Sequence, residues 1–180
     1  MSADGPILLS ARLDVLNWRL DDAGLVQRLH GTAETSRYLS GGKPWDLKKA
    51  EARLASWIEE YRQHGVTKFK LVARDSGDFV GRAGFSWFAE TEGFELGYSF
   101  CREAWGRGYA TEIARTLTGW FFDKGFADRF TAFAQAENGA SIRVMQKIGM
   151  RECEPIVIDD VPCRRFEIDR SMWMPVRTPN

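Results

Sequence analysis

A glycine-rich turn leading straight into a helix is the part of this 180-residue sequence best suited to bind an anion. The segment reads Trp105-Gly106-Arg107-Gly108-Tyr109-Ala110. Glycines let the backbone turn tightly and approach a ligand, and a helix N-terminus offers unpaired N–H groups with a partial positive charge. We therefore expect residues 105–110 to hold a phosphate or pyrophosphate. The spacing fits neither a P-loop nor a dinucleotide-binding fingerprint.

The elements around this turn predict a strand on one side and a helix on the other. Residues 94–101 read as a strand, and residues 107–124 carry apolar side chains at helical spacing before Gly125. We also predict strands at 8–19, 68–74, 79–88, 129–135, 151–159 and 163–173, and helices from Asp21 or Asp22 through Leu29, over 47–64, and from Asn138. The predicted fold class is α/β (α+β): one domain over residues 1–180, with a mixed, mostly antiparallel sheet flanked by helices.

Three sequence blocks resemble the GNAT acetyltransferase superfamily. Residues 105–110 resemble its acetyl-CoA signature, Gln or Arg followed by x-x-G-x-G/A, with Trp105 in place of Gln or Arg. Residues 138–150 resemble the family's N-x-x-S-x-x-v-x-x-K-x-G-F helix, and residues 9–13 resemble an opening strand, L-x-T-x-R-L. The form W-G-[KR]-G-Y-A-T-E is common among ribosomal-protein N-terminal (alanine/serine) acetylases, so the resemblance points to that branch.

The resemblance implies an enzyme that binds acetyl-CoA as a co-substrate and needs no metal. The pantetheine arm of acetyl-CoA would pair with the main chain of Tyr98, Ser99 and Phe100, and residues 105–110 would hold its pyrophosphate. Asn138 and Ser141 would contact the cofactor, although Asn138 also suits a helix N-cap. Three cations either pair with the phosphates or form a solvated helix face: Arg107, Arg143 and Lys147.

The chemistry of acetyl transfer gives these residues roles. Glu95 is the candidate general base, or else an exposed strand carboxylate, and an α-amino group needs little help because its reference pKa is about 8. Many GNAT enzymes place a Tyr four residues after the serine, but here that position is Met145, which cannot donate a proton. Ser141, Tyr98 or water remain as acids for the thiolate. Direct attack by the amine is favoured over an acetyl-Cys101 intermediate.

The acceptor is the least constrained part of the sequence. Trp45, beside a glycine-rich loop, and Trp87 are candidate substrate-binding residues, although aromatic side chains also build cores. The branch resemblance implies a protein N-terminal amine. Polyamines, antibiotics and other small amines are alternative acceptors.

Composition limits the remaining classes of function. Net charge is zero and 44% of residues are apolar, which favours a compact enzyme without general affinity for nucleic acid or membranes. Neither a membrane-spanning stretch nor a signal peptide is recognisable, so we expect a cytoplasmic protein. The three cysteines are scattered and are expected to be reduced thiols rather than disulfide or zinc ligands. The closing strands could support a homodimer.

Three hypotheses follow. The chain is an active acetyl-CoA-dependent N-acetyltransferase, a cofactor-binding regulatory module on a decayed acetyltransferase scaffold, or an unrelated phosphate-binding domain. We favour the first because the glycine turn, the preceding strand and the second helix are all intact.

Overall fold

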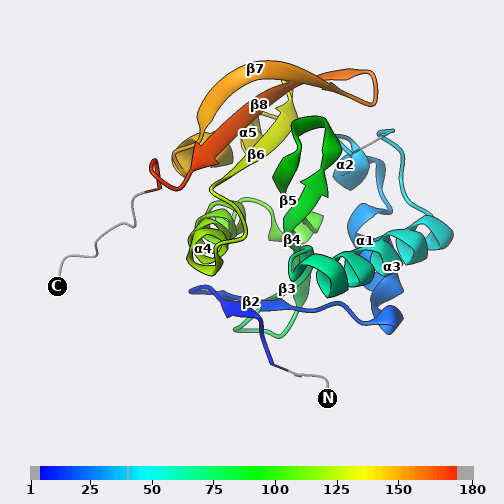
Figure 1. Ribbon diagram of the computed structural model, residues 1–180. Helices are drawn as coiled ribbons and strands as arrows, with labels where there is room; N and C mark the ends of the chain where they lie inside the picture. Colours follow the sequence, from blue (N-terminus) through cyan, green and yellow to red (C-terminus); the bar gives the residue numbers. More distant parts are fainter. Residues whose placement is uncertain (1–4, 40, 174–180) are drawn as a thin grey trace.

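A mixed eight-stranded sheet forms the centre of the computed structural model, which describes residues 5–39 and 41–173 (Figure 1). The strands lie in the order β1-β2-β3-β4-β5-β6-β8-β7. Their bounds are β1 Leu8–Leu9, β2 Leu13–Leu16, β3 Lys68–Ala73, β4 Phe79–Phe88, β5 Gly93–Phe100, β6 Arg129–Gln135, β7 Arg151–Ile158 and β8 Val161–Asp169. Neighbouring strands are antiparallel except β5 and β6, which are parallel. The predicted fold class is confirmed.

Helices cover both faces of this sheet. Their bounds are α1 Ala23–His30, α2 Ala33–Ser36, α3 Leu47–His64, α4 Tyr109–Lys124 and α5 Gly139–Lys147, with 3-10 turns η1 Leu20–Asp22, η2 Ala89–Thr91 and η3 Arg102–Ala104. The larger core packs α4 and α5 on the sheet through residues such as Leu96 and Phe121. A smaller core lies under α1 and α3 around Trp57 and Phe79. Figure 1 shows α4 on one side of the central strands and α1 and α3 on the other.

Local signals fix the ends of α3 where the sequence predicted them. Asp46 accepts a hydrogen bond from the Lys49 N–H at 2.8 Å, which satisfies one free donor of the first turn. Gly65 ends the helix in a left-handed conformation with φ of 70°, which costs glycine little. The helix predicted over residues 47–64 is confirmed. Its buried stripe, Ala50, Leu54 and Trp57, turns toward the smaller core.

The N-terminal strand predicted over residues 8–19 is wrong as a single element. The structure has two short antiparallel strands, β1 and β2, joined by a turn at Ser10. The Ser10 N–H donates to Leu13 O at 2.9 Å, and the Leu13 N–H donates to Ser10 Oγ at 3.0 Å. A serine side chain that bonds its own neighbouring backbone offers an alternative to a continuous ladder.

The other differences also lie at element ends. The final strand stops at Asp169 instead of residue 173, because Asp169 Oδ1 accepts the Met172 N–H at 2.9 Å and starts a turn. The signature helix starts at Tyr109 instead of residue 107, since Gly108 has a φ of 78°. Asp22 occupies the N-cap position of α1, but its carboxylate binds Lys70 Nζ at 2.7 Å instead of capping. The short helix α2 was not predicted.

Among the described helices, none combines the length and apolarity that a membrane crossing requires.

Candidate functional site

The ladder between β5 and β6 is reduced to one paired position. Glu95 of β5 pairs with Thr131 of β6, and Thr131 Oγ1 also donates to Phe94 O at 3.4 Å. From there β6 follows β8 while β5 follows β4, so the two strands separate. Residues 96–100 of β5 therefore present a main-chain edge that pairs with none of the described strands. The predicted cofactor residues Tyr98, Ser99 and Phe100 lie on this open edge.

The turn after β5 carries a row of free N–H groups. Gly106 and Gly108 have φ values of 75° and 78°, in the left-handed region where glycine is the least strained residue. Within the described part of the chain, no hydrogen bond uses the N–H of the five residues Gly106, Arg107, Gly108, Tyr109 and Ala110. These donors lie at the start of α4, whose helix dipole adds positive potential. The arrangement suits an anion.

A half-buried carboxylate holds this turn against the N-terminal hairpin. Glu112, on the first turn of α4, accepts hydrogen bonds from Ser10 Oγ at 2.7 Å and from the Arg12 N–H at 2.8 Å. Arg12 also pairs with the second carboxylate oxygen and lies over the Tyr109 ring at 4.7 Å. Burial alone would raise the pKa of Glu112, but the hydrogen bonds from Ser10 and Arg12 lower it below its ordinary value. The carboxylate thus stays ionised and anchors the start of α4.

Trp105 is tied to the end of β5. Its indole N–H donates to Phe100 O at 2.8 Å, and its own backbone N–H donates to Arg102 O at 3.2 Å. Arg102 also lies over the indole ring at 4.8 Å and pairs with Glu34 at 2.7 Å. The groups of Trp105 are therefore used to shape the turn, and its backbone N–H is not among the free donors.

The N-terminus of α5 is bonded to β5 at its open edge. Asn138 caps α5, since its Oδ1 accepts the Ser141 N–H at 3.2 Å. Tyr98 joins the strand to this helix by donating its hydroxyl to Ser141 O at 3.1 Å. The side-chain hydroxyl of Ser141 bonds to no described residue. The structure thus brings Tyr98, Asn138 and Ser141 together.

Glu95 is held in an ion pair that the sequence did not reveal. Lys68 Nζ lies 2.5 Å from Glu95 Oε2 and also donates to Glu95 O at 2.8 Å and Gly84 O at 3.2 Å. The two side chains are only 7% and 15% exposed. Burial lowers the pKa of Lys68, while the Glu95 carboxylate opposes that shift. The other carboxylate oxygen of Glu95, Oε1, has no donor among the described residues.

Comparison with known proteins identifies this arrangement. A model of the acetyltransferase (GNAT) domain matches residues 12–151, which span β2, the open strand edge, the glycine turn and α5. The chain belongs to the GNAT acetyltransferase family. It is therefore an acyltransferase, and its fold is that of the family.

Individual relatives are similar to this GNAT chain over most of their length. An uncharacterised protein of Bacillus subtilis (strain 168), YkkB, is 30% identical over 139 residues, which are 76% of this chain and 79% of the relative. Among solved structures, RimL, the ribosomal L7/L12 α-N-protein acetyltransferase in complex with coenzyme A, has a TM-score of 0.78 at 13% identity, covering 91% of this chain and 97% of that one.

The structure of AAC(6')-Ib in complex with ribostamycin and coenzyme A is about as similar. Its TM-score is 0.75 at 14% identity, covering 93% of this chain and 99% of that one. At such identities the two likenesses show the fold alone. One of these proteins is a ribosomal-protein acetyltransferase and the other binds ribostamycin, so the GNAT fold by itself leaves the acceptor open.

Two side chains bear on the chemistry of this GNAT chain. Met145, four residues after Ser141, is 1% exposed and packs in the larger core. Cys101 is 2% exposed, and burial, aided by the charge of Glu103, raises the pKa of its thiol to about 11. A buried thiol that stays protonated is a poor nucleophile.

All three cysteines are free thiols, and no group of metal-ligating side chains is found among the described residues.

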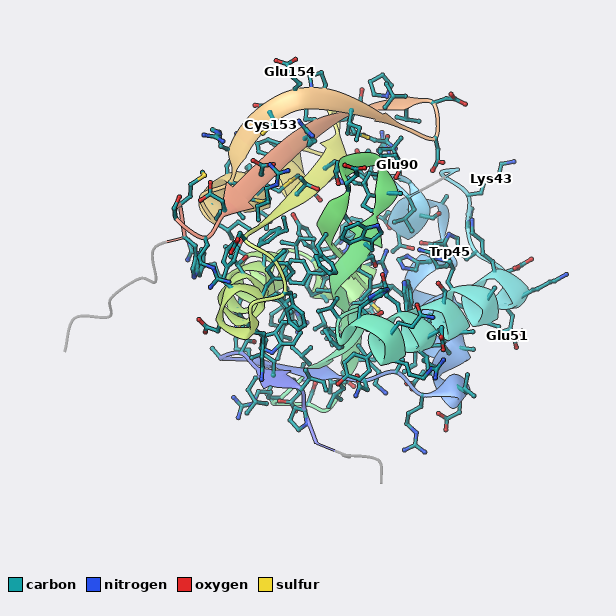
Figure 2. All side chains as sticks on the ribbon, in the orientation of Figure 1. Lys43, Trp45, Glu51, Glu90, Cys153 and Glu154 are labelled. Atoms are coloured by element: carbon teal, nitrogen blue, oxygen red, sulfur yellow. The ribbon has the colours of Figure 1, made fainter. Side chains whose placement is uncertain are left out.

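The two candidate substrate-binding tryptophans have opposite environments. Trp45 is 6% exposed, lies just before α3 (Figure 2) and packs on His30 with ring centroids 4.3 Å apart. Trp87 is 53% exposed and packs edge-on against Phe94 near the β4–β5 hairpin. Trp87 follows Ser86, and Ser86 pairs with Glu95. Trp87 therefore lies near the point where β5 and β6 meet.

The three cations considered for phosphate binding are exposed. Arg107, Arg143 and Lys147 form no ion pair with any described residue. Arg107 lies inside the glycine turn and Arg143 lies on α5, whereas Lys147 is at the far end of α5. Their guanidinium and ammonium groups are thus available, with Arg107 the best placed.

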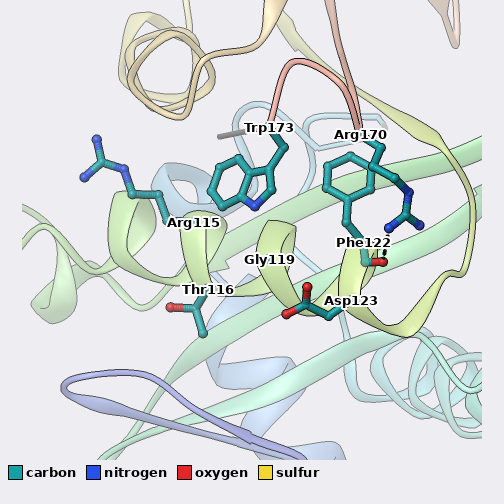
Figure 3. Close-up of a pocket in the computed structure, with 7 residues that line it drawn as sticks. All are labelled: Arg115, Thr116, Gly119, Phe122, Asp123, Arg170 and Trp173. Atoms are coloured by element: carbon teal, nitrogen blue, oxygen red, sulfur yellow. Dashed lines mark hydrogen bonds between the residues drawn. The ribbon is translucent and has the colours of Figure 1, made fainter. Parts of the chain in front are cut away.

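A pocket of about 470 Å³ lies elsewhere, along α4 and the chain that follows β8 (Figure 3). Its walls include Arg115, Gly119 and Trp173, and Arg170 donates to Phe122 O at 2.6 Å. None of the residues predicted for the site lines this pocket. We therefore do not place acetyl transfer there.

Proposed function

We propose that this chain transfers the acetyl group of acetyl-CoA to a primary amine, and that the acceptor is the α-amine of a protein N-terminus. The observation that carries the proposal is the row of free N–H groups at residues 106–110, which follows the open edge of β5 after the short turn η3. The first feature fits a pyrophosphate and the second fits an extended arm with amide groups.

The dimensions of the strand support this assignment. Glu95 and Phe100 are five residues apart, which corresponds to about 17 Å of extended strand. Tyr98 and Ser99 would bind the arm along that length, while residues 106–110 hold the pyrophosphate with Arg107 beside it. The thioester would then lie near Glu95, where the strands meet.

Transfer then proceeds by direct attack. The lone pair of the amine forms a bond to the thioester carbonyl carbon, the carbon–sulfur bond breaks, and the electron pair leaves on the CoA sulfur. The amine must lose one proton, and Glu95 Oε1 is the acceptor, directly or through a water molecule, because Oε2 is bound to Lys68. Because the reference pKa of an α-amine is only about 8, a carboxylate held in an ion pair is a sufficient proton acceptor.

The departing thiolate needs a proton donor. Burial raises the pKa of Tyr98 above its ordinary value, even though its bond to Ser141 opposes the shift, so its hydroxyl keeps its proton. That proton is directed at Ser141 O, whereas the Ser141 hydroxyl is unengaged. We assign the transfer to Ser141 Oγ, which passes a proton from solvent water to the sulfur and ends as a neutral hydroxyl, and we treat Tyr98 as the residue that positions α5.

The choice of acceptor rests on the sequence of the turn. The segment from Trp105 to Glu112 resembles the branch of the ribosomal-protein N-terminal acetylases. A small-molecule amine is the second candidate, favoured by the similarity to AAC(6')-Ib in complex with ribostamycin.

The experiment is a direct search for the acceptor. The purified chain is incubated with isotopically labelled acetyl-CoA and a cell extract, and the labelled products are identified by mass spectrometry. Label on protein N-termini supports the proposal, and label on small amines supports the second candidate. Absence of labelled product, despite measured binding of acetyl-CoA, would overturn both and favour a non-catalytic binding module.

A further inference from the structure

The smaller core contains three buried nitrogen atoms without hydrogen-bond partners. They are His30 Nδ1, Trp45 Nε1 and Trp57 Nε1, on residues that are 0%, 6% and 1% exposed. Buried polar groups are nearly always bonded, so three in one cluster call for an explanation. The rings adjoin one another, with centroids 4.3 Å apart for His30 and Trp45 and 6.4 Å apart for Trp45 and Trp57.

All three atoms are donors. An indole N–H can only donate. His30 Nε2 accepts a hydrogen bond from Arg82 Nε at 3.0 Å, so in the neutral ring the proton lies on Nδ1. Burial, with the nearby charges of Arg82, Arg53 and Lys49, lowers the pKa of His30 to about 2, which keeps the ring neutral. The cluster therefore offers N–H groups and lacks an acceptor for them.

Arg82 adds a buried charge to the same cluster. It is 8% exposed, and its guanidinium lies 5.0 Å over the Trp57 ring. Arg82 lies beside two other cations, Lys68 and Lys70, on this face of β3 and β4. Lys68 pairs with Glu95, and Lys70 pairs with Asp22 at 2.7 Å. Arg82 has no carboxylate partner among the described residues, and its terminal nitrogens make no hydrogen bond there. The Arg82 guanidinium is thus the one of these three cations that no carboxylate of the described residues contacts.

The cluster lies close to the proposed site of transfer. Arg82 of β4 pairs with Ser99 of β5, which is on the same sheet face as Glu95 and four residues further along the strand. Four residues correspond to about 13 Å of strand. To reach Arg82, an acceptor with its amine near Glu95 would need a second group at about this separation and a path past the Lys68 side chain, which lies over Gly97.

We infer that the acceptor carries a carboxylate, which accepts hydrogen bonds from Arg82 and the neighbouring donors of His30, Trp45 and Trp57 while its amine is acetylated. This inference rests on the proposed function. A carboxylate supplies both the negative charge and the acceptor atoms that the cluster lacks, and hydrogen bonds to it are stronger than those to a neutral amide. A polycationic acceptor would add positive charge beside Arg82.

The test compares acceptors that differ only at this group. A series of ω-amino acids of increasing length is assayed against the corresponding amides, and the peptide Ala-Asp-Ala-amide is assayed against Ala-Asn-Ala-amide. We expect kcat/KM to favour the carboxylate by about tenfold or more at the best length, since a charged hydrogen bond contributes at least about that factor. In Arg82→Met the ratio falls toward one. Equal rates for acids and amides at every length would overturn the inference.

A binding measurement keeps the test decisive if Arg82→Met does not fold. Trp45→Phe and Trp57→Phe each remove one N–H and keep the aromatic ring, and Trp120→Phe on α4 is the matched control. The same two variants assign the indole N–H signals in a nitrogen-15 spectrum of the wild type. Addition of 6-aminohexanoate should shift the Trp45 and Trp57 signals and leave the Trp120 signal in place. Addition of 6-aminohexanamide should shift none of the three signals.

The outcomes separate the two proposals. If the indole signals shift but no acceptor is acetylated, the proposed function falls and the carboxylate site stands. If amines are acetylated but no carboxylate shifts the signals, the donors hold only buried water, and the inference is overturned while the proposed function remains.

Discussion

Lys68 and Glu95 form a buried ion pair across three strands, with Nζ 2.5 Å from Oε2. The lysine side chain crosses two glycines that face each other, Gly84 of β4 and Gly97 of β5. A Cβ on Gly97 would lie 2.8 Å from Lys68 Nζ, so a larger residue there would displace the lysine. Because the two glycines have no side chains, they leave room for Lys68 to reach Glu95, the carboxylate proposed to accept the amine proton.

The ion pair should couple stability to catalysis. Glu95→Gln removes the proton acceptor and should lower kcat about 100-fold with a peptide acceptor. Lys68→Met leaves Glu95 with a buried, unbalanced charge and should cost about 3 kcal/mol of unfolding free energy. The double variant Lys68→Met/Glu95→Gln removes both charges and should recover part of that stability. Urea unfolding and steady-state kinetics measure the two effects.

The two readouts distinguish a catalytic from a structural carboxylate. Glu60, which accepts hydrogen bonds from Thr67 at 3.2 Å and Ser86 at 3.0 Å, provides the control. Glu60→Gln alters a half-buried carboxylate on the same sheet face without touching the proposed base. If Glu95→Gln lost stability but kept full activity, its role would be structural and the proposed base would be wrong.

The glycine turn gives a second prediction. Gly108→Ala places a Cβ at a φ of 78°, among the free N–H groups and 3.6 Å from Arg12. Gly77→Ala, in the turn between β3 and β4, has a φ of 75° and open space around its Cβ. Both variants should lose about 1 kcal/mol of stability. Only Gly108→Ala should also raise KM for acetyl-CoA, by about tenfold. A similar KM in both variants would argue that residues 106–110 do not bind the cofactor.

His30 should make the protein less stable in acid. Burial and the charges of Arg82, Arg53 and Lys49 lower its pKa from 6.5 to about 2 in the folded state. Between those two pH values His30 is protonated in the unfolded chain and neutral in the folded chain. The free energy of unfolding therefore decreases as the pH falls below 6.5. The loss approaches 1.4 kcal/mol per pH unit, or about 2 kcal/mol between pH 7.5 and pH 5.

Replacement of each histidine in turn checks this assignment. His30→Gln should show a smaller decrease in urea stability between pH 7.5 and pH 5 than the wild type. His64→Gln alters the other histidine of the chain, which is exposed at the end of α3, and should keep the wild-type decrease. Identical pH dependence in wild type and His30→Gln would show that His30 titrates normally.

The sequence predicts those features that depend on neighbours along the chain. The cap at Asp46, the stop at Gly65 and the glycine turn all rest on contacts within a few residues. Asn138 at the start of α5 was predicted for the same reason, since its partner Ser141 is three residues away.

Contacts across the sheet could not be predicted in this way. Lys68 and Glu95 are 27 residues apart, and Arg82 and His30 are 52 apart, so their meeting depends on strand register and helix placement. Glu112 bonds to Ser10 over 102 residues. A lysine inside a buried strand was the one visible signal for the first of these pairs, because buried lysines are rarely left without a partner.

Cys101 tests whether transfer is direct. Its thiol is 2% exposed and has its pKa raised to about 11 by burial and the charge of Glu103, so at neutral pH it carries no nucleophilic thiolate. Cys101→Ala should therefore keep kcat within about twofold, since direct attack asks nothing of this sulfur. Cys163→Ala, which removes another buried free thiol, is the matched control for packing losses. A covalent acetyl-cysteine route predicts a loss of about a thousandfold or more in Cys101→Ala alone, together with an acetylated enzyme in rapid-quench mass spectra.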